Sequence, residues 1–152
     1  MSIFITVTNL SRRNPDIDKK IVINAEKILA VEELSNEPGV LIVIKDTGYA
    51  DAKTHLWIFA KESFDELVEK IKKTHCYHPF VSLNRNYTVR KISFSVKILL
   101  STRDIAMVLE LKNSGSLVLL EASRYVREAI GENIFVAESV AEINEKISGE
   151  LG

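Results

Sequence analysis

The 152-residue chain has few of the residues that cross-link, break or anchor a fold: one cysteine (Cys76), three prolines and six glycines. A single cysteine excludes an intrachain disulfide, which fits a reducing compartment. No hydrophobic run approaches the roughly 20 residues that a transmembrane helix needs. The opening segment MSIFITVTNLSRRNP does not have the order of a signal peptide, because its short apolar stretch precedes the arginines. We therefore expect a cytoplasmic protein without a membrane partner.

Charge is nearly balanced, with a formal net charge of −1 at pH 7. Hydrophobic residues make up 46% of the chain and charged residues 27%. This composition is typical of a globular protein and excludes a disordered chain. A net charge near zero also gives no general attraction to polyanions.

Two segments 76 positions apart are nearly the same: WIFAKESFDELVEKI (residues 57–71) and NIFVAESVAEINEKI (residues 133–147), identical at eight of fifteen positions. The same spacing aligns GVLIVIK (39–45) with GSLVLLE (115–121). Self-similarity at a fixed spacing indicates an internal duplication. We expect a first unit over residues 1–74, a linker over 75–79 and a second unit over 80–152.

Each unit is expected to form four strands and one closing helix (ββββα), which gives an α+β fold with mostly antiparallel sheet. Opening strands over 4–8 and 80–83 are each followed by a polar excursion that carries arginines. The continuous apolar runs 40–44 and 117–120 are typical of strands buried on both faces. Because a unit of about 70 residues has only a marginal core, we expect the two units to pack together as a pseudo-two-fold intramolecular dimer.

The helix starts carry capping boxes, Ser63 with Glu66 and Ser139 with Glu142. A serine beside glutamates also suggests acid and nucleophile chemistry, but capping explains the serine and the second glutamate. Gly39 and Gly115 sit in the predicted hairpin turns, where positive φ is needed.

The runs INAEKILAVEEL, GVLIVIKD and IFAKESFDELVEKI resemble the FlbD/SwrD family of bacterial flagellar and swarming-motility proteins. This resemblance implies short β-rich units with a closing helix and a binding or regulatory role without catalytic residues. Two departures stand out: the loop over residues 10–20 is longer than in the family, and the chain carries two units where family members have one.

A second resemblance competes with the first. FVSLNRNYTVRKI (80–92), followed by LVLLEASRYVREAI (117–130), is similar to the LytTR family of DNA-binding domains. The matching positions are Arg85, Tyr87, Val89, Ser123, Arg124 and Tyr125. Asn84, Asn86 and Arg90 depart from the family pattern, and the last strand and helix of the chain have no place in that fold.

A basic stretch supports the second resemblance. Residues 70–103 contain eight lysines or arginines and no acidic residue. Interleaved aromatic residues make this stretch a candidate nucleic-acid surface, for which the candidate residues are Arg85, Tyr87, Arg90, Lys91 and Arg124. The alternative is that these cations pair with acids from the flanking sequence across the sheet.

The sequence offers candidate residues for two further kinds of site. The candidate residues for contact with a protein partner, or for a small anionic ligand held between the units, are Arg12, Arg13, Tyr49 and Tyr125. His75, Cys76 and His78 lie close together in the linker, but with His55 elsewhere they do not reach the ligand set and spacing of a structural zinc site. We expect no metal and no cofactor.

Motifs of known catalytic sites are absent from the sequence, and no histidine recurs in both units. We therefore predict that the chain is not an enzyme. The leading hypothesis is a non-catalytic cytoplasmic binding or regulatory protein, bacterial or phage, that acts on another macromolecule, most simply a protein. The alternatives are a LytTR-like nucleic-acid-binding regulator and a small anionic-ligand-binding protein.

Overall fold

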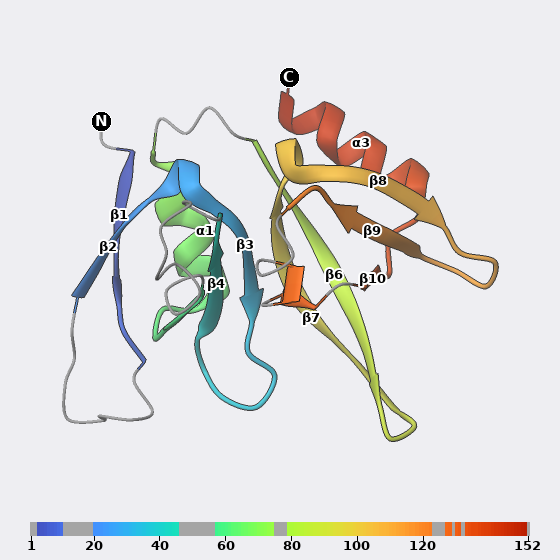
Figure 1. Ribbon diagram of the computed structural model, residues 1–152, viewed down its shortest axis with the longest axis horizontal. Coiled ribbons are helices and arrows are strands. Elements are labelled where there is room, and N and C mark those ends of the chain that lie inside the picture. Colours follow the sequence, from blue (N-terminus) through green and yellow to red (C-terminus); the bar gives the residue numbers. More distant parts are fainter. Residues whose placement is uncertain are drawn as a thin grey trace.

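The structure of the protein is a computed structural model that describes residues 3–10, 20–45, 57–74, 79–122, 127–128, 130–131 and 133–151. The fold is a mixed α+β fold, in which antiparallel strands form one large and one small sheet and α-helices pack beside them (Figure 1). The predicted fold class is confirmed at this level.

The first half contains β1 (Phe4–Thr8), β2 (Lys20–Asn24), the 3-10 helix η1 (Ala25–Lys27), β3 (Ile28–Glu33), β4 (Val40–Ile44), β5 (Trp57–Ala60) and α1 (Phe64–Lys72). The second half contains β6 (Phe80–Val89), β7 (Ile92–Ser101), η3 (Thr102–Asp104), β8 (Ile105–Glu110), β9 (Ser116–Leu120), β10 (Ile134–Val136) and α3 (Val140–Leu151). Within the described part of the chain, each half has five strands where four were expected. The short turns η1 and η3 redirect the chain, so that the strand before each turn and the strand after it pair with different neighbours.

The expected strand over residues 80–83 is too short, because β6 continues to Val89 through residues that were expected to form a polar loop. Asn84, Asn86 and Thr88 are exposed, while Arg85 is buried and Tyr87 is half-buried. The side chains therefore alternate with the period of two that a strand requires. A charged residue on the inner face concealed this alternation in the sequence.

The large sheet has the strand order β5-β4-β3-β7-β6-β10-β9-β8. The halves join where β3 pairs with β7, in the register Ala30↔Leu100, Val31↔Leu99 and Glu32↔Ile98. β3 is the third strand of its half and β7 is the second strand of its own, whereas a two-fold axis pairs like surfaces with like. The expected pseudo-two-fold packing is therefore wrong, and the halves follow one another head to tail.

Strands within each half have the same neighbours. β1 meets β5 at a bridge between Asn9 and Ala60, and β6 meets β10 at the pair Arg85 and Val136. The first half thus has the order β2-β1-β5-β4-β3 and the second half β7-β6-β10-β9-β8. The two bridges lie 76 positions apart in the sequence.

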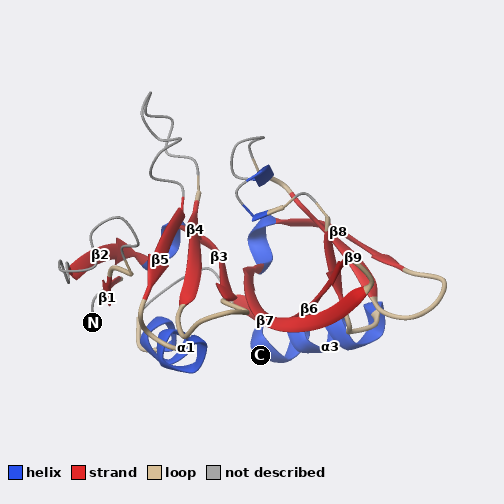
Figure 2. Ribbon diagram, turned by 90° about the horizontal axis from the view of Figure 1, so that it is seen from below, coloured by secondary structure: helices blue, strands red, loops and turns tan. Residues whose placement is uncertain are grey.

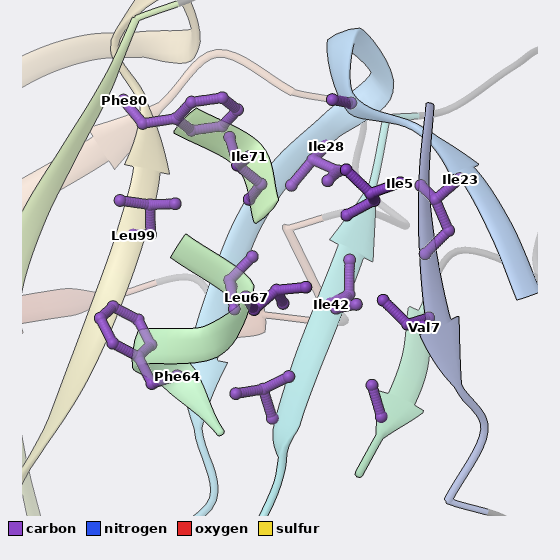
Figure 3. Close-up of a cluster of buried hydrophobic side chains, with 14 residues drawn as sticks. Ile5, Val7, Ile23, Ile28, Ile42, Phe64, Leu67, Ile71, Phe80 and Leu99 are labelled. Atoms are coloured by element: carbon purple, nitrogen blue, oxygen red, sulfur yellow. The ribbon is translucent and has the colours of Figure 1, made fainter. Parts of the chain in front are cut away.

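Each half has its own apolar core. The first core lies between its strands and α1, and Phe80 and Leu99 of the second half reach into it (Figure 3). The second core lies between its strands and α3, which contributes Ile143. In Figure 2, β7 and β6 form a curved band, and α3 lies beside it.

Strands β3 and β7 are buried on both faces because they lie between the cores. Val31 and Leu99 belong to the first core, whereas Ala30 and Leu100 belong to the second. The run 117–120 was expected to be doubly buried, but β9 alternates between buried and half-buried residues. The prediction of a strand in the core is therefore confirmed, but one face of that strand is only half-buried.

The repeated fifteen-residue segment forms the corner between the last strand and the helix in both halves. Ser63 accepts a hydrogen bond from the backbone N–H of Glu66 (3.2 Å), and Ser139 accepts one from Glu142 (3.1 Å). In the second half, the N–H of Ser139 also donates to the Glu142 carboxylate (3.3 Å), which completes the capping box. The capping prediction is confirmed.

The glutamate before each cap is also structural. Glu62 accepts the backbone N–H of Thr8 with both carboxylate oxygens (2.8 and 3.1 Å). Glu138, which is buried, accepts the N–H of Asn84 in the same way (3.0 and 3.1 Å), and the Lys146 ammonium lies 3.5 Å away. Glu62 and Glu138 thus hold a strand to a helix start at the same place in both halves.

Gly39 and Gly115 have positive φ values of 123° and 79°. A Cβ atom at either position would collide with a carbonyl oxygen, that of Ala60 or that of Val136. Glycine is therefore required at both turns for conformation and for space.

Candidate interaction site

The second half carries a long hairpin in which β6 and β7 pair at every position from Phe80↔Ser101 to Val89↔Ile92. We call its outer part, residues 86–95, the arm; it projects beyond the neighbouring strands (Figure 1). The two turn residues, Arg90 and Lys91, have φ values of 50° and 68°. Positive φ at both positions is the geometry of a type I′ turn, which usually contains Asn and Gly. A residue with a side chain is strained in this conformation, and residues with such strain are concentrated at functional sites.

The tip of the arm, residues 89–92, combines apolar surface with charge. Val89 and Ile92 face each other across the strands and are 53% and 68% exposed. Arg90 and Lys91 lie between them, and both are exposed. Large exposed apolar residues next to cations are typical of a surface that contacts another molecule.

The stem of the arm holds the tip in a defined shape. The rings of Tyr87 and Phe94 stack across the two strands, with centroids 5.3 Å apart and planes inclined by 19°. On the other face, the Ser95 hydroxyl donates to the Asn86 side chain at 2.9 Å. Cross-strand pairs of this kind each contribute roughly 0.2–1 kcal/mol, so the arm is a preformed projection.

The base of the arm contains a buried ion pair that joins the two halves. Arg85 on β6 is 3% exposed. Its Nη1 atom donates to the Glu32 carboxylate on β3 (2.7 Å) and to the carbonyl of Ile130 (2.7 Å). The Tyr87 hydroxyl donates to the other oxygen of Glu32 at 2.6 Å, and the guanidinium lies 4.6 Å from the Tyr87 ring centroid.

These surroundings also keep the Tyr87 phenol in its neutral form. Burial raises its pKa well above the ordinary value of 10.0, and the hydrogen bond to Glu32 and the negative charge of that carboxylate raise it further. The positive charge of Arg85 acts in the opposite direction and does not cancel these effects. Tyr87 is therefore a permanent donor to Glu32 at neutral pH.

The structure divides the residues that were predicted to bind nucleic acid. Arg90 and Lys91 lie together at the tip, but Arg85 and Tyr87 are occupied in the cluster with Glu32. Arg124 lies outside the described residues. The arm therefore presents two exposed cations where a larger basic surface was predicted.

The wider basic stretch does not form one patch. Within the described residues, four of its eight cations form ion pairs with acids from residues 32–69, namely Lys70–Glu62, Lys72–Glu69, Arg85–Glu32 and Lys97–Asp65. α1, which carries Lys70 and Lys72, and the arm also lie in different parts of the molecule (Figure 1). The alternative interpretation, that these charges pair with acids from the flanking sequence across the sheet, is correct for Arg85 and Glu32, which both lie on strands. In the other three pairs, the acid comes from the flanking sequence but lies in α1 or just before it.

The remaining candidate residues, Arg12, Arg13, Tyr49 and Tyr125, lie outside the described residues, so their role stays a prediction. A cavity of about 350 Å³ does occur between the halves, beside α1, β6 and β7. Its lining includes Lys72 and Lys97 but also the carboxylate of Asp65. Mixed charge of this kind gives no preference for an anion.

Neither a metal site nor a membrane-spanning helix is found in the described part of the chain. No three possible metal ligands come together there. His55, His75, Cys76 and His78 lie outside it, so the absence of a metal site stays a prediction. None of the helices within these residues is long and apolar enough to cross a bilayer.

Comparison with known proteins gives no match: neither a protein-family model, nor a curated protein, nor a solved structure corresponds to this chain. The FlbD/SwrD and LytTR resemblances therefore stay predictions from the sequence.

Proposed function

We propose that this chain is a non-catalytic, cytoplasmic binding or regulatory protein, bacterial or phage, that engages a protein partner through the tip of its β6–β7 arm. The observation that carries the proposal is the tip itself. Arg90 and Lys91 are in a strained turn between the exposed side chains of Val89 and Ile92. Exposed apolar residues and a backbone conformation that costs roughly 1–3 kcal/mol per residue disfavour folding alone, so binding is the simplest reason for their presence.

The chemistry of the tip indicates the kind of partner surface. Two β-branched side chains fit a shallow apolar pocket, and two cations fit acidic groups at its rim. Apolar contact at the centre with charge at the rim is the usual anatomy of a protein–protein interface. A rigid hairpin also binds with little loss of conformational entropy.

We further propose that residues 1–74 and 80–152 are tandem copies of one five-stranded unit, joined by the linker 75–79. This is supported by the common order of elements, the common strand neighbours, and the contacts of Glu62 and Glu138 that recur at the same spacing. What the halves share is structural: caps, turn glycines and strand-to-helix contacts. A duplication that repeats no reactive group supports a binding role over an enzymatic one.

The test compares the wild-type chain with Val89→Ser/Ile92→Ser and with Arg90→Glu/Lys91→Glu in affinity purification from cells that produce it. We expect a protein that is enriched by the wild type and lost with both tip variants. Calorimetry with the purified partner then measures affinity, and removal of an interface hot spot weakens binding about thirtyfold.

The matched control is Lys72→Glu, which changes an exposed charge on α1 and leaves the arm intact. Circular dichroism establishes that all variants are folded. A partner that binds the tip variants as well as the wild type contradicts the proposal, and so does a reproducible turnover that a point mutation abolishes.

Nucleic-acid binding is the second candidate, because Arg90 and Lys91 are exposed together. Two phosphate contacts predict a slope of log K against log salt of about −1.8 for duplex DNA and about −1.4 for single strands. Fluorescence anisotropy with labelled duplex and single-stranded DNA at low salt separates the two functions. The protein-partner proposal expects no binding in either case.

A further inference from the structure

The junction between the two halves shows how one unit of this fold accepts another. β7 pairs along the open edge of β3, and Phe80 and Leu99 enter the core beside α1 (Figure 3). At one end, Lys45 and Asp104 form an ion pair across the junction at 3.0 Å. The junction therefore combines strand pairing, apolar side chains that enter the neighbouring core, and ion pairs.

Each half leaves the opposite edge open within the described residues. β2 pairs there with β1 alone, and β8 pairs with β9 alone. By the shared strand order, β2 corresponds to β7, and β8 corresponds to β3. The two free edges are therefore the same two kinds of edge that meet at the junction. An unpaired strand edge is a ready site for pairing with another chain.

The strand registers give the correspondence residue by residue. Phe4 pairs with Asn24 in the first half, and Phe80 pairs with Ser101 in the second, so β1 and β6 differ by 76 positions and β2 and β7 by 77. The third strands also differ by 77, because the bulge at Ile28–Ala30 recurs at Ile105–Met107.

Several side chains at the free edges are apolar, as most of those at the junction are, but they are exposed. Val22 on β2 corresponds to Leu99 and is 65% exposed, and Phe4 corresponds to Phe80 and is also exposed. Met107 and Leu109 on β8 correspond to the junction residues Ala30 and Glu32 and are 51% and 42% exposed. Apolar residues at the two outermost edges are unusual unless a partner covers them.

The receiving groove is also present. A cavity of about 430 Å³ lies between β8 and α3 and is lined by Val108, Ile143, Asn144 and Ile147, among others. In the first half, the corresponding surface between β3 and α1 receives Phe80 and Leu99. The groove beside α3 thus lies where, in the first half, the side chains from β6 and β7 are accepted.

Charges at the free edges are complementary. Lys45 and Asp104, one of the ion pairs across the junction, correspond to Glu121 and Lys27, so both signs are exchanged and the attraction between the two positions is kept. The pairs Arg85–Glu32 and Lys97–Asp65 have no charged counterpart pair at the free edges. The Glu33 carboxylate accepts the backbone N–H of Lys97 across the junction. The counterpart of Glu33 is Glu110, and the counterpart of Lys97 is Lys20. A carboxylate and a backbone N–H are therefore available at the free edges for the same hydrogen bond.

We propose that this chain associates head to tail with further copies of itself, with the β8 edge of one copy paired to the β2 edge of the next. The junction register, carried over to these edges, gives Met107↔Ile23, Val108↔Val22 and Leu109↔Ile21. Phe4 and Val22 of the incoming copy enter the groove beside α3, and Lys27 faces Glu121. Because the joined edges are unlike, each added copy leaves one edge of each kind open, and the assembly grows as a chain.

The test uses edge-blocking lysines at exposed positions, Val22→Lys on β2 and Leu109→Lys on β8, and sedimentation velocity from low to high micromolar protein. The wild type is expected to gain mass with concentration beyond a dimer. Each variant alone is expected to stay monomeric, because only one of its edges still pairs. An equimolar mixture of the two is expected to form a dimer and nothing larger, because one edge of each kind remains.

A charge exchange tests the register. Lys27→Glu or Glu121→Lys alone is expected to weaken association about two- to fivefold, as for a partly exposed ion pair, and the variant with both changes is expected to recover. Lys91→Glu at the tip is the matched control and leaves association unchanged, so failure of the arm proposal and failure of this one are distinguishable.

Two results would overturn the proposal. One is a wild type that is monomeric at every concentration. The other is a Val22→Lys or Leu109→Lys variant that still dimerises alone, because this shows a symmetric contact of like edges or a contact elsewhere. Circular dichroism of each variant separates loss of association from loss of fold.

Discussion

The ion pair between Arg85 and Glu32 is predicted to be the most sensitive contact between the halves. In Glu32→Leu, the guanidinium keeps its position and its carbonyl partners but loses the charge that neutralises it at 2.7 Å. Removal of one partner of a buried ion pair costs about 3–5 kcal/mol, because the other charge stays buried and uncompensated. Leucine is a suitable replacement, since it is apolar and close to glutamate in size. The expected loss is a large share of the 5–15 kcal/mol that stabilises a typical domain.

A second variant distinguishes this cause from simple loss of contacts. In Glu32→Leu/Arg85→Met, no charge remains in the cluster, and apolar side chains of similar volume fill the space. Replacement of a whole buried ion pair is often neutral or stabilising, so the double variant is expected to be more stable than Glu32→Leu. Urea unfolding followed by circular dichroism gives the free energies. Thermal midpoints are expected to fall by roughly 6–20 °C for Glu32→Leu, at about 2–4 °C per kcal/mol for a chain of this size.

The matched control is the exposed pair of Lys97 and Asp65, 3.6 Å apart, which also joins the two halves. Asp65→Ala is expected to cost less than about 1 kcal/mol, because exposed ion pairs are screened by water. The reasoning is refuted if Glu32→Leu costs no more than this control, or if the effects of Glu32→Leu and Arg85→Met simply add in the double variant.

Three further predictions concern single residues. Gly115→Ala and Gly39→Ala are each expected to lower the free energy of unfolding by more than about 1 kcal/mol, because alanine disfavours positive φ and its Cβ meets a carbonyl oxygen; urea unfolding with unchanged stability contradicts this. Ser139→Ala is expected to cost about 1 kcal/mol through loss of the helix cap, and Ser139→Asp, which caps equally well, is expected to restore it. In an alkaline absorbance titration, one tyrosine is expected to ionise well above pH 10, and this step is expected to be absent from Tyr87→Phe, because the pKa of Tyr87 is raised in the folded state. The contribution of Tyr87 to stability is complete below about pH 10 and is lost as pH rises toward its folded-state pKa. The stability of the wild type relative to Tyr87→Phe is therefore expected to fall in that range. A titration that is the same with and without Tyr87 contradicts the assignment.

The local elements of this fold follow from local signals in the sequence. The capping residues Ser63 and Ser139, the turn glycines and the apolar strands all act within a few residues of themselves, so their roles are readable without a partner. The pairing of β3 with β7 is different in kind. It joins residues about 70 positions apart, and no local pattern states which edge of one half meets which edge of the other.

The candidate site was harder to predict because its residues have partners that are distant in sequence. Arg85 was interpreted as one cation of a basic stretch, yet its partner Glu32 lies 53 positions upstream. A signal was present in both strands: Glu32 follows the apolar run ILAV, and Arg85 occupies the inner position after Leu83. A charged residue at an inner strand position predicts an opposite charge nearby, because a lone buried charge is too costly.

Head-to-tail growth and the arm, if both proposals hold, act together. Each added copy contributes one arm, held at a fixed place relative to the last because the strand register repeats. An assembly of this kind presents many arms to a partner, and linked weak contacts give an avidity far above that of one contact. The two edge-blocking variants should then lower the apparent affinity for a multivalent partner while the affinity of the isolated subunit stays the same. Tip variants should abolish binding while assembly proceeds, because the arm lies on neither edge that the copies share.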